Sequence, residues 1–371
     1  MKLLIIMHST NTLYGAGKSL LGWLNKVNCP YDLLYPKTIF NYNENKFQNK
    51  FNDYCKNKFS AWIPLYHNIK GRESASIKGK MYWVFNNIMY KLNKRKISKI
   101  IDKGNYDAIY LNSLVLYPLV SEKNNFILHV REIFDGNQKV LAKITRKLEK
   151  CAGVIFIDYA TATPFKDVIC KKTILNNPFN MLSVDTINSK DVLKKLKLDS
   201  DKSICAIIGV ISSDKGIERV LEAFRISRIE SYLLVVGDCN RKYAQKLKKN
   251  YGNLQNIIFT GEIENINEIY SIADVIIRGE EQFCIGRTIF EGLYSGCHVL
   301  IPGELTDIEN IVENEKFINK IHFYKPGNIQ DMASALKKLE NRKIEKRKFM
   351  SNDIKYTNDI IRFIKNSISK V

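Results

Sequence analysis

Short apolar runs alternate with helical patterns from the first residue of this chain to the last. The runs lie at residues 3–7, 31–35, 108–111, 126–130 and 154–157, and again at 203–208, 232–236, 257–260, 273–277, 298–301 and 320–323. Continuous apolar runs are typical of strands buried on both faces of a parallel sheet, and helices between them complete βαβ units. A length of 371 residues suits two domains. The pattern therefore predicts an α/β protein with two Rossmann-like, doubly wound sheets.

The boundary between the two series falls at residues 173–181, Thr-Ile-Leu-Asn-Asn-Pro-Phe-Asn-Met. The residue before a proline is disfavoured in a helix, so Pro178 and its flanking asparagines indicate a turn or hinge. We therefore predict an amino-terminal domain of residues 1–177 and a carboxyl-terminal domain of residues 178–352. The last residues, about 353–371, have a basic, helical pattern.

The chain carries 58 Lys and Arg against 38 Asp and Glu, a formal net charge of +20. Such an excess attracts polyanions. Residues 77–101 interleave aromatic and methionine side chains with lysines and an arginine. Two interpretations fit this segment: a helix on an anionic membrane surface, or a core helix whose lysines are solvated. Zinc-finger, RRM and basic-zipper signatures do not occur, so nucleic acid is not an expected partner.

Neither a spanning segment nor a metal site is expected. No apolar run is long enough to cross a bilayer, and the apolar start is too short for a signal peptide, so we expect a cytoplasmic protein. The eight cysteines include no Cys-x-x-Cys pair, which predicts reduced thiols without zinc or disulfides. His8, His67, His298 and His322 lie singly in the sequence and are interpreted as structural.

Residues 278–302 are the most informative segment for function. An apolar strand runs into a polar, glycine-containing turn, and a short helix follows whose first turn holds Gly286, Arg287 and Thr288. Backbone N–H groups, a positive helix end and an arginine would then meet at the carboxyl edge of a parallel sheet, where an anion such as a diphosphate binds. Glu291 follows Arg287 by four residues and shares its helix face, placed to accept hydrogen bonds from ligand hydroxyls. The segment predicts a nucleotide-sugar site.

This segment resembles the donor-binding segment of the retaining glycosyltransferases of family 4, which reads roughly Glu-x-Phe-Gly-Arg-Thr-x-x-Glu. The run from Gly286 to Gly292 matches it. The resemblance implies that Gly286, Thr288 and Glu291 bind the donor and that Arg287 acts in catalysis.

The first glutamate of that pattern is displaced here. The family separates its two glutamates by seven residues, and Phe283 holds the expected position in this chain. We predict that Glu281 takes the role of the first glutamate, with Cys284 and Ile285 as an insertion. Glu280 is an alternative on charge alone.

A second motif lies at residues 208–217, Ile-Gly-Val-Ile-Ser-Ser-Asp-Lys-Gly-Ile. It is similar to the family's Gly-Arg-x-x-x-x-Lys-Gly, whose arginine and lysine hold the donor diphosphate. Lys215 matches the lysine, but Val210 stands where the family has the arginine. Loss of this bidentate donor would weaken diphosphate binding unless Arg287 supplies the missing charge. Gly209 and Gly237, at the ends of two predicted strands, are expected beside the nucleotide.

The amino-terminal half carries weaker signals. Residues 14–21 fit neither a P-loop nor a dinucleotide fingerprint, but they resemble the family's Gly-Gly-Ala-x-x-Ser-Leu-Leu, which makes Gly15 and Ala16 expected phosphate neighbours. Residues 128–132 resemble the family's His-x-Arg-Glu, in which the histidine approaches the transferred sugar. His129 is therefore a catalytic candidate, with a structural histidine as the alternative. Candidates on the acceptor side are Asn112, Arg131 and Glu132.

The resemblance implies a GT-B fold, with two Rossmann-like domains facing across a cleft and the last helix packing back on the first domain. It implies transfer with retention to a lipid-linked or oligosaccharide acceptor in bacterial surface-polysaccharide synthesis. Lys215 and Arg287 would stabilise the leaving diphosphate without a metal or other cofactor. Two alternatives stay open. One is an inverting enzyme or an epimerase, with Glu132 or Asp135 as base, and the other is a non-catalytic GT-B partner of a transferase.

Overall fold

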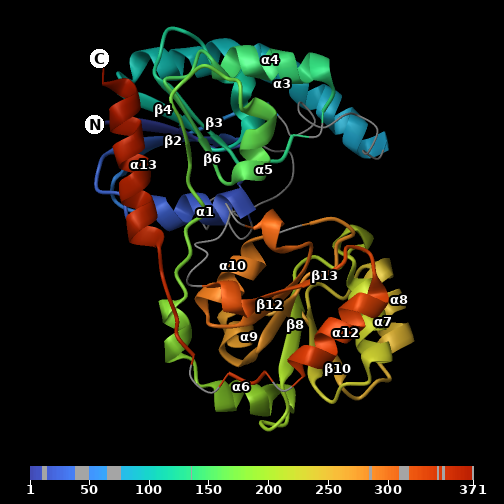
Figure 1. Ribbon diagram of the computed structural model, residues 1–371. Helices are drawn as coiled ribbons and strands as arrows, with labels where there is room; N and C mark the ends of the chain where they lie inside the picture. The colour runs from blue at the N-terminus through green and yellow to red at the C-terminus, as the bar shows by residue number, and fades with distance from the viewer. Residues whose placement is uncertain are drawn as a thin grey trace. The chain divides into compact units, whose positions relative to one another are not determined.

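The computed structural model describes residues 1–10, 15–37, 50–64, 77–134, 136–283, 286–308, 317–340, 342–344 and 347–369. The chain divides into two compact units, Met1–Pro178 with Asn352–Val371, and Phe179–Ser351. The divisions predicted from the sequence lie at 177/178 and at about 352/353, within one residue of these. Each unit is built around one parallel sheet flanked by helices (Figure 1).

The sheet of the first unit has the strand order β3-β2-β1-β4-β5-β6-β7. Its strands are β1 (Leu3–Ile6), β2 (Tyr31–Pro36), β3 (Cys55–Ala61), β4 (Ala108–Leu111), β5 (Phe126–Val130), β6 (Gly153–Phe156) and β7 (Lys172–Ile174). Its helical segments are α1 (Gly15–Leu24), α3 (Ile77–Lys103), η3 (Leu114–Leu119), α4 (Gln138–Leu148), α5 (Tyr159–Ala162), η4 (Thr163–Phe165) and α13 (Asp353–Ile368). Helices α3 and α4 pack on one face of the sheet, and α1 and α13 pack on the other. The last helix of the chain thus belongs to the first unit.

The sheet of the second unit has the order β10-β9-β8-β11-β12-β13. Its strands are β8 (Ile204–Ile208), β9 (Tyr232–Val236), β10 (Ile257–Gly261), β11 (Val275–Ile277), β12 (His298–Pro302) and β13 (Ile321–Tyr324). Its helical segments are η5 (Leu182–Thr186), α6 (Ser189–Leu196), η6 (Ser213–Lys215), α7 (Ile217–Ser227), α8 (Lys242–Tyr251), α9 (Asn267–Ile272), α10 (Arg287–Tyr294), η7 (Leu305–Asp307), η8 (Ile318–Lys320) and α12 (Ile329–Leu339). The direction in which strands are added reverses between β8 and β11, which makes this the topological switch point.

Two strands, β3 and β7, were not predicted from the sequence, and they are the two edges of the first sheet. Strand β3 reads Cys-Lys-Asn-Lys-Phe-Ser-Ala, and only Ala61 is fully buried in it. An edge strand has one open side and tolerates charged side chains, so it lacks the apolar run of a central strand. The apolar pattern therefore identified the interior of the sheet and not its borders.

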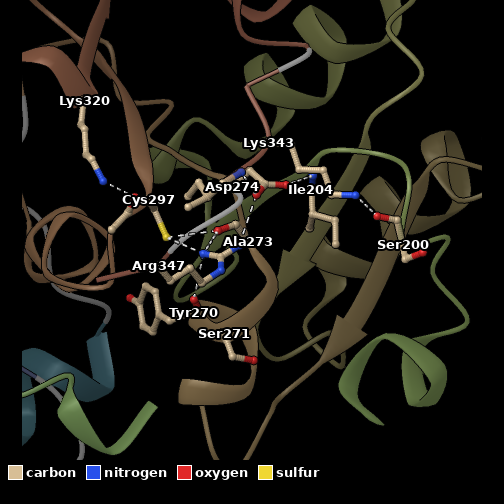
Figure 2. A network of polar contacts seen from close by, with 12 residues as sticks. Ser200, Ile204, Tyr270, Ser271, Ala273, Asp274, Cys297, Lys320, Lys343 and Arg347 are labelled. Atoms are coloured by element: carbon tan, nitrogen blue, oxygen red, sulfur yellow. Dashed lines mark hydrogen bonds and ion pairs between the residues drawn. The ribbon is translucent and has the colours of Figure 1, made fainter. Parts of the chain in front are cut away.

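A buried polar network holds the amino ends of β8 and β11 (Figure 2). Asp274, which is 3% exposed, accepts hydrogen bonds from the backbone N–H of Ile204 (2.9 Å) and of Ile344 (3.1 Å). The Arg347 guanidinium pairs with the same carboxylate at 3.2 Å and donates to the Ala273 carbonyl at 2.7 Å. This network fixes Ile344 and Arg347 to the sheet, at the edge opposite the carboxyl ends of the strands.

Within the part of the chain that the structure describes, no helix combines the length and the apolar character needed to cross a membrane.

Candidate functional site

A pocket opens at the carboxyl ends of β8 and β11. It is lined by Ile207, Ile208, Gly209, Val210, Lys215, Ile217, Arg278, Gly279 and Glu280. These residues come from the ends of the two strands at the switch point and from the turns that follow them. Open α/β sheets bind their ligands at this position, because the loops on either side diverge and leave a crevice.

Two glycines bring the walls of this pocket together. A Cβ atom on Gly216 would lie 1.6 Å from the Gly279 carbonyl oxygen, and one on Gly279 would lie 2.4 Å from the Gly216 carbonyl oxygen. Gly216 also has φ +63°, in the left-handed region that favours glycine. The loop that carries Lys215 can therefore touch the loop that carries Arg278 only because both contact residues are glycines.

The charged side chains of the pocket meet at Glu280. Arg278 forms a two-bond ion pair with it: Nε donates to Oε2 at 3.1 Å, and Nη2 donates to Oε1. Lys215 Nζ lies 3.6 Å from the same Oε1. Lys215 also lies 3.8 Å from the exposed carboxylate of Asp214, and its own side chain is 42% exposed. Two cations and one carboxylate line the pocket, so the lining carries a net positive charge.

The structure differs from the sequence prediction about the first glutamate. Glu281 was expected in the site, but its side chain is 72% exposed and its carboxylate accepts a hydrogen bond from Arg219 at 2.8 Å. Glu280 is 9% exposed and lines the pocket. Of these two carboxylates, Glu280 lies in the pocket and Glu281 faces away from it, because the turn after β11 directs the first one inward. Cys284 and Ile285, the predicted insertion, lie outside the described residues.

Helix α10 begins directly after Gly286, its N-cap. Glu291 is buried, and its carboxylate accepts hydrogen bonds from Arg287 Nη2 at 3.1 Å and from the Tyr270 hydroxyl at 2.9 Å. Burial, followed by the Glu291 charge, raises the pKa of Tyr270 well above its usual value, so the phenol remains a donor. Arg287 also lies over the Phe179 ring, 4.7 Å from its centroid. Arg287 and Glu291 share one helix face, as their spacing predicts, but Arg287 does not line the pocket.

The remaining donor-side candidates surround the same pocket. Gly209 lines it with φ +141°, and a Cβ on Gly237 would lie 2.1 Å from the Gly209 carbonyl oxygen, so the ends of β8 and β9 are in close contact. The Thr288 hydroxyl accepts a hydrogen bond from Arg278 Nη1 at 3.1 Å. Val210 is 43% exposed on the pocket lining. An apolar side chain therefore occupies the place of the arginine in the similar motif.

In the first unit, His129 lies inside the protein and not at a surface. Side chains alternate along β5, and His129 shares with Ile127 the face that α1 and α13 cover. Its imidazole is completely buried, with Nδ1 at 2.5 Å from the Tyr110 hydroxyl and 3.4 Å from Arg131 Nη2. Burial, followed by the Arg131 charge, holds the pKa of His129 well below its usual value. Complete burial matches the structural alternative for His129, and its contact with a sugar stays a prediction.

Arg131 connects the parts of the first unit. Its Nε donates to Asn112 Oδ1 and its Nη1 donates to Asn177 Oδ1, both at 2.8 Å. Its Nη2 lies 3.4 Å from the Tyr356 hydroxyl on α13. Asn112 in turn donates to the carbonyl of Ala16 at 3.1 Å. This arginine ties β5 to β4, to the segment that leaves the unit and to the helix that returns to it, so its contacts are structural.

Glu132 and the start of α1 complete the predicted residues. The Glu132 carboxylate accepts hydrogen bonds from the Ser113 hydroxyl at 2.6 Å and from the Leu114 N–H at 2.9 Å, which fixes the turn after β4. Gly15 starts α1 with φ +48°, and the residues that precede it, 11–14, lie outside the described part of the chain. The second candidate base, Asp135, lies outside it as well.

Arg278 begins the informative segment 278–302, but no role was predicted for it from the sequence. It precedes the glycosyltransferase-like motif and follows β11 directly, and only its position between a buried strand and Gly279 could have indicated a pocket residue. Among the side chains that the structure describes, no group of three or more His, Cys, Asp or Glu residues could hold a metal ion.

Comparison with known proteins supports the interpretation of the second unit. Residues 188–356 match the family model of Glycosyl transferases group 1. No curated protein sequence matches the chain.

Solved structures of similar fold cover almost the entire chain. HepE of Anabaena in complex with UDP has a TM-score of 0.69 at 15% identity, over 99% of this chain and 100% of that one. Sucrose-phosphate synthase from Thermosynechococcus elongatus has 0.67 at 14% identity, over 99% and 97%. A glycosyltransferase from Rickettsia africae has 0.63 at 15% identity, over 99% and 94%. The chain therefore has the GT-B fold of two Rossmann-like units, and its second unit carries a region similar to group 1 glycosyltransferases.

Proposed function

We propose that this protein is a retaining glycosyltransferase of family 4 type, which moves a sugar from a nucleotide diphosphate sugar to a glycan acceptor. One observation carries the proposal: the positively charged pocket at the switch point of the second sheet lies within the region that matches the group 1 glycosyltransferases. A site at the carboxyl ends of parallel strands, with a lysine beside it, suits the diphosphate of such a donor.

The proposed chemistry needs charge stabilisation more than proton transfer. Cleavage of the glycosidic bond leaves a nucleoside diphosphate, and Lys215 and the backbone N–H groups at the start of α10 would stabilise that developing charge without a metal. Transfer with retention would pass through an oxocarbenium-like state on the donor face. Glu291 would accept hydrogen bonds from donor hydroxyls, a role that requires its carboxylate to exchange partners with Arg287.

We propose a uridine nucleotide as the donor. HepE, which shares the fold over its whole length, was solved with UDP and with UDP-glucose. The binding experiment below compares nucleotide sugars and so tests which sugar the donor carries.

We propose an acceptor on a lipid carrier in bacterial surface-polysaccharide synthesis, reached by a cytoplasmic protein that attaches peripherally to an anionic membrane. Helix α3 supports this proposal because it leaves a continuous apolar stripe exposed. The exposed side chains, with their exposed fractions, are Met81 (68%), Val84 (47%), Phe85 (42%), Ile88 (53%) and Leu92 (71%). Their spacing of three or four residues places them on one face of the helix.

Basic residues continue that face toward the carboxyl end of α3. Lys91, Arg95 and Lys99 are exposed and follow the stripe at helical spacing. An apolar stripe with basic residues beside it is complementary to anionic lipid, whose headgroups attract the charges while the acyl region accepts the apolar side chains. The exposure of the stripe favours this interpretation over the alternative of a helix buried along its apolar side.

Vesicle sedimentation tests the membrane proposal. The protein should bind vesicles that contain phosphatidylglycerol and should bind pure phosphatidylcholine weakly. Each basic residue near such a surface contributes about 1 kcal/mol, so Lys91→Gln/Arg95→Gln/Lys99→Gln should lower the partition coefficient by about 100-fold. Lys246→Gln, on the exposed side of α8, is the control and should bind like the wild type. Equal binding by the triple variant would remove α3 from the proposal.

A non-catalytic GT-B partner protein is the second candidate. Two observations favour it: Val210 occupies the place of an arginine, and His129 is sealed in the core. Such a protein would bind a glycan or lipid without turning over a donor.

Nucleotide binding separates the two candidates. Thermal unfolding of the wild type is measured with UDP, GDP, ADP, CMP and their sugars, alongside Lys215→Ala. A ligand that binds the native state raises Tm by mass action. At a ligand concentration of 100 times Kd, the free energy of unfolding increases by about 2.7 kcal/mol. Stabilisation by one nucleotide family that Lys215→Ala abolishes, followed by release of that nucleotide from its sugar with acceptor present, would support the transferase. No stabilisation by any nucleotide would exclude it and leave the partner protein.

A further inference from the structure

The pocket has no arginine at position 210, where the similar motif places the guanidinium that binds the diphosphate. Val210 contributes only apolar surface to the lining. Lys215 is a point charge on a flexible stem and does not offer the planar pair of donors that suits a phosphate group. Arg287 does not line the pocket. Any bidentate contact to the diphosphate must therefore come from another residue.

Arg278 is placed to supply this contact. It lines the pocket from the end of β11, the strand that pairs with β8, and its side chain is only 12% exposed. The two bonds to Glu280 and the bond to Thr288 hold the guanidinium in one orientation. A guanidinium fixed in this way loses little conformational freedom when a ligand binds.

The guanidinium also lies at the start of α10. A Cβ atom on Gly286, the N-cap, would lie 3.0 Å from Arg278 Nη1, so the side chain packs directly against the backbone there. A cation beside the positive end of a helix is favourable only with an anion next to both. The Glu280 carboxylate balances the charge of Arg278 and lies 3.6 Å from Lys215.

We propose that Arg278 is the guanidinium that binds the donor diphosphate, in place of the arginine whose position Val210 occupies. The proposal rests on the proposed function of the pocket and assigns the cation to β11 instead of the loop after β8. The diphosphate would add an anion to a cluster that already holds Lys215, Arg278 and one carboxylate, and it would lie between Arg278 and the N-terminus of α10.

Calorimetric titration of UDP and UMP tests this assignment. We expect Arg278→Met to weaken UDP binding by about 10- to 100-fold, the loss typical of a charge-assisted bidentate contact. UMP, which lacks the β-phosphate, should lose much less, so the ratio of the two affinities should fall. Arg225→Met is the matched control, because it removes the same charge from the exposed side of α7 and should leave both affinities unchanged.

A second variant protects the test against misfolding. Arg278→Met leaves Glu280 buried without its main partner, whereas Arg278→Met/Glu280→Gln removes both charges and no buried charge remains unpaired. The double variant should show the same fall in the UDP to UMP affinity ratio, with a wild-type circular dichroism spectrum.

The results separate the inference from the proposed function. Wild-type affinity ratios in both variants, together with loss of UDP binding in Lys215→Ala, would overturn the assignment of Arg278 and leave the pocket as a nucleotide site. A wild-type protein that binds no nucleoside diphosphate would overturn the proposed function, and this inference with it.

Discussion

The ion pair between Arg347 and Asp274 offers a direct test of how the second unit is held together. In Arg347→Met, Asp274 keeps the backbone donors of Ile204 and Ile344 but loses the guanidinium at 3.2 Å. Removing one partner of a buried ion pair typically costs about 3–5 kcal/mol, because the other charge stays buried. The two backbone donors still satisfy part of the carboxylate, so we expect a loss of about 3 kcal/mol in the free energy of unfolding of this unit.

The chain provides its own internal reference for this measurement. Its three tryptophans, Trp23, Trp62 and Trp83, all belong to the first unit, so tryptophan fluorescence follows that unit alone. Far-UV circular dichroism follows both units. With a urea m-value of about 2 kcal/mol/M, a loss of 3 kcal/mol lowers the midpoint by about 1.5 M. Arg347→Met should therefore show an early transition in circular dichroism and an unchanged transition in fluorescence.

The pH dependence identifies the cause. Burial raises the pKa of Asp274, while its hydrogen bonds and Arg347 oppose that rise. Without Arg347 the pKa should rise further, and a group whose pKa is raised on folding is stabilised when it is protonated. The deficit of Arg347→Met should then be smaller at pH 5 than at pH 8. Arg225→Met, which breaks an exposed pair in the same unit, is the control and should not move the midpoint. A deficit that is the same at both pH values, or below about 1 kcal/mol, would refute the role of a buried unpaired charge.

Three further predictions follow from other parts of the structure. Gly279→Ala would place a Cβ 2.4 Å from the Gly216 carbonyl oxygen. We expect the free energy of unfolding to fall by about 1–3 kcal/mol in a urea titration, and UDP binding to weaken in calorimetry. Unchanged values would show that the two loops can separate freely. Burial, followed by the neighbouring His322, lowers the pKa of His298 to about 4. The native state then binds fewer protons than the unfolded state between about pH 6.5 and 4. The free energy of unfolding should therefore decrease by about 1–2 kcal/mol as the pH is lowered through this window, after allowance for partial exposure. His298→Gln should flatten that slope, and an unchanged slope would assign it to other groups. Sugar transfer should continue at the same rate in EDTA, and a rate restored only by added Mg²⁺ or Mn²⁺ would contradict a metal-independent reaction.

The sequence determined the fold class because central strands of a parallel sheet must be apolar on both faces. Each central strand of both sheets appears as an apolar run, from β1 at Leu3–Ile6 to β12 at His298–Pro302. The edge strands of the first sheet, β3 and β7, escaped because an open side permits polar residues, whereas the edge strands of the second sheet, β10 and β13, kept apolar runs and were predicted. The sequence also placed Lys215 at the carboxyl edge of the second sheet, where it lines the pocket. A lysine and a glycine between a buried strand and the helix that follows it must lie at that edge.

Only the tertiary structure decided which neighbouring side chain faces the pocket and which faces away. Glu280 and Glu281 are adjacent and chemically identical, and the turn after β11 selects the first by a change of backbone direction that no residue type reveals. His129 follows a strand pattern that suits a cleft as well as a core, and the packing of α1 and α13 places it in the core. Arg278 became a candidate only when β8 and β11, about 70 residues apart, were placed side by side. The physical reason is the same in each case: local sequence fixes burial and periodicity, whereas contacts between distant segments fix orientation and partners.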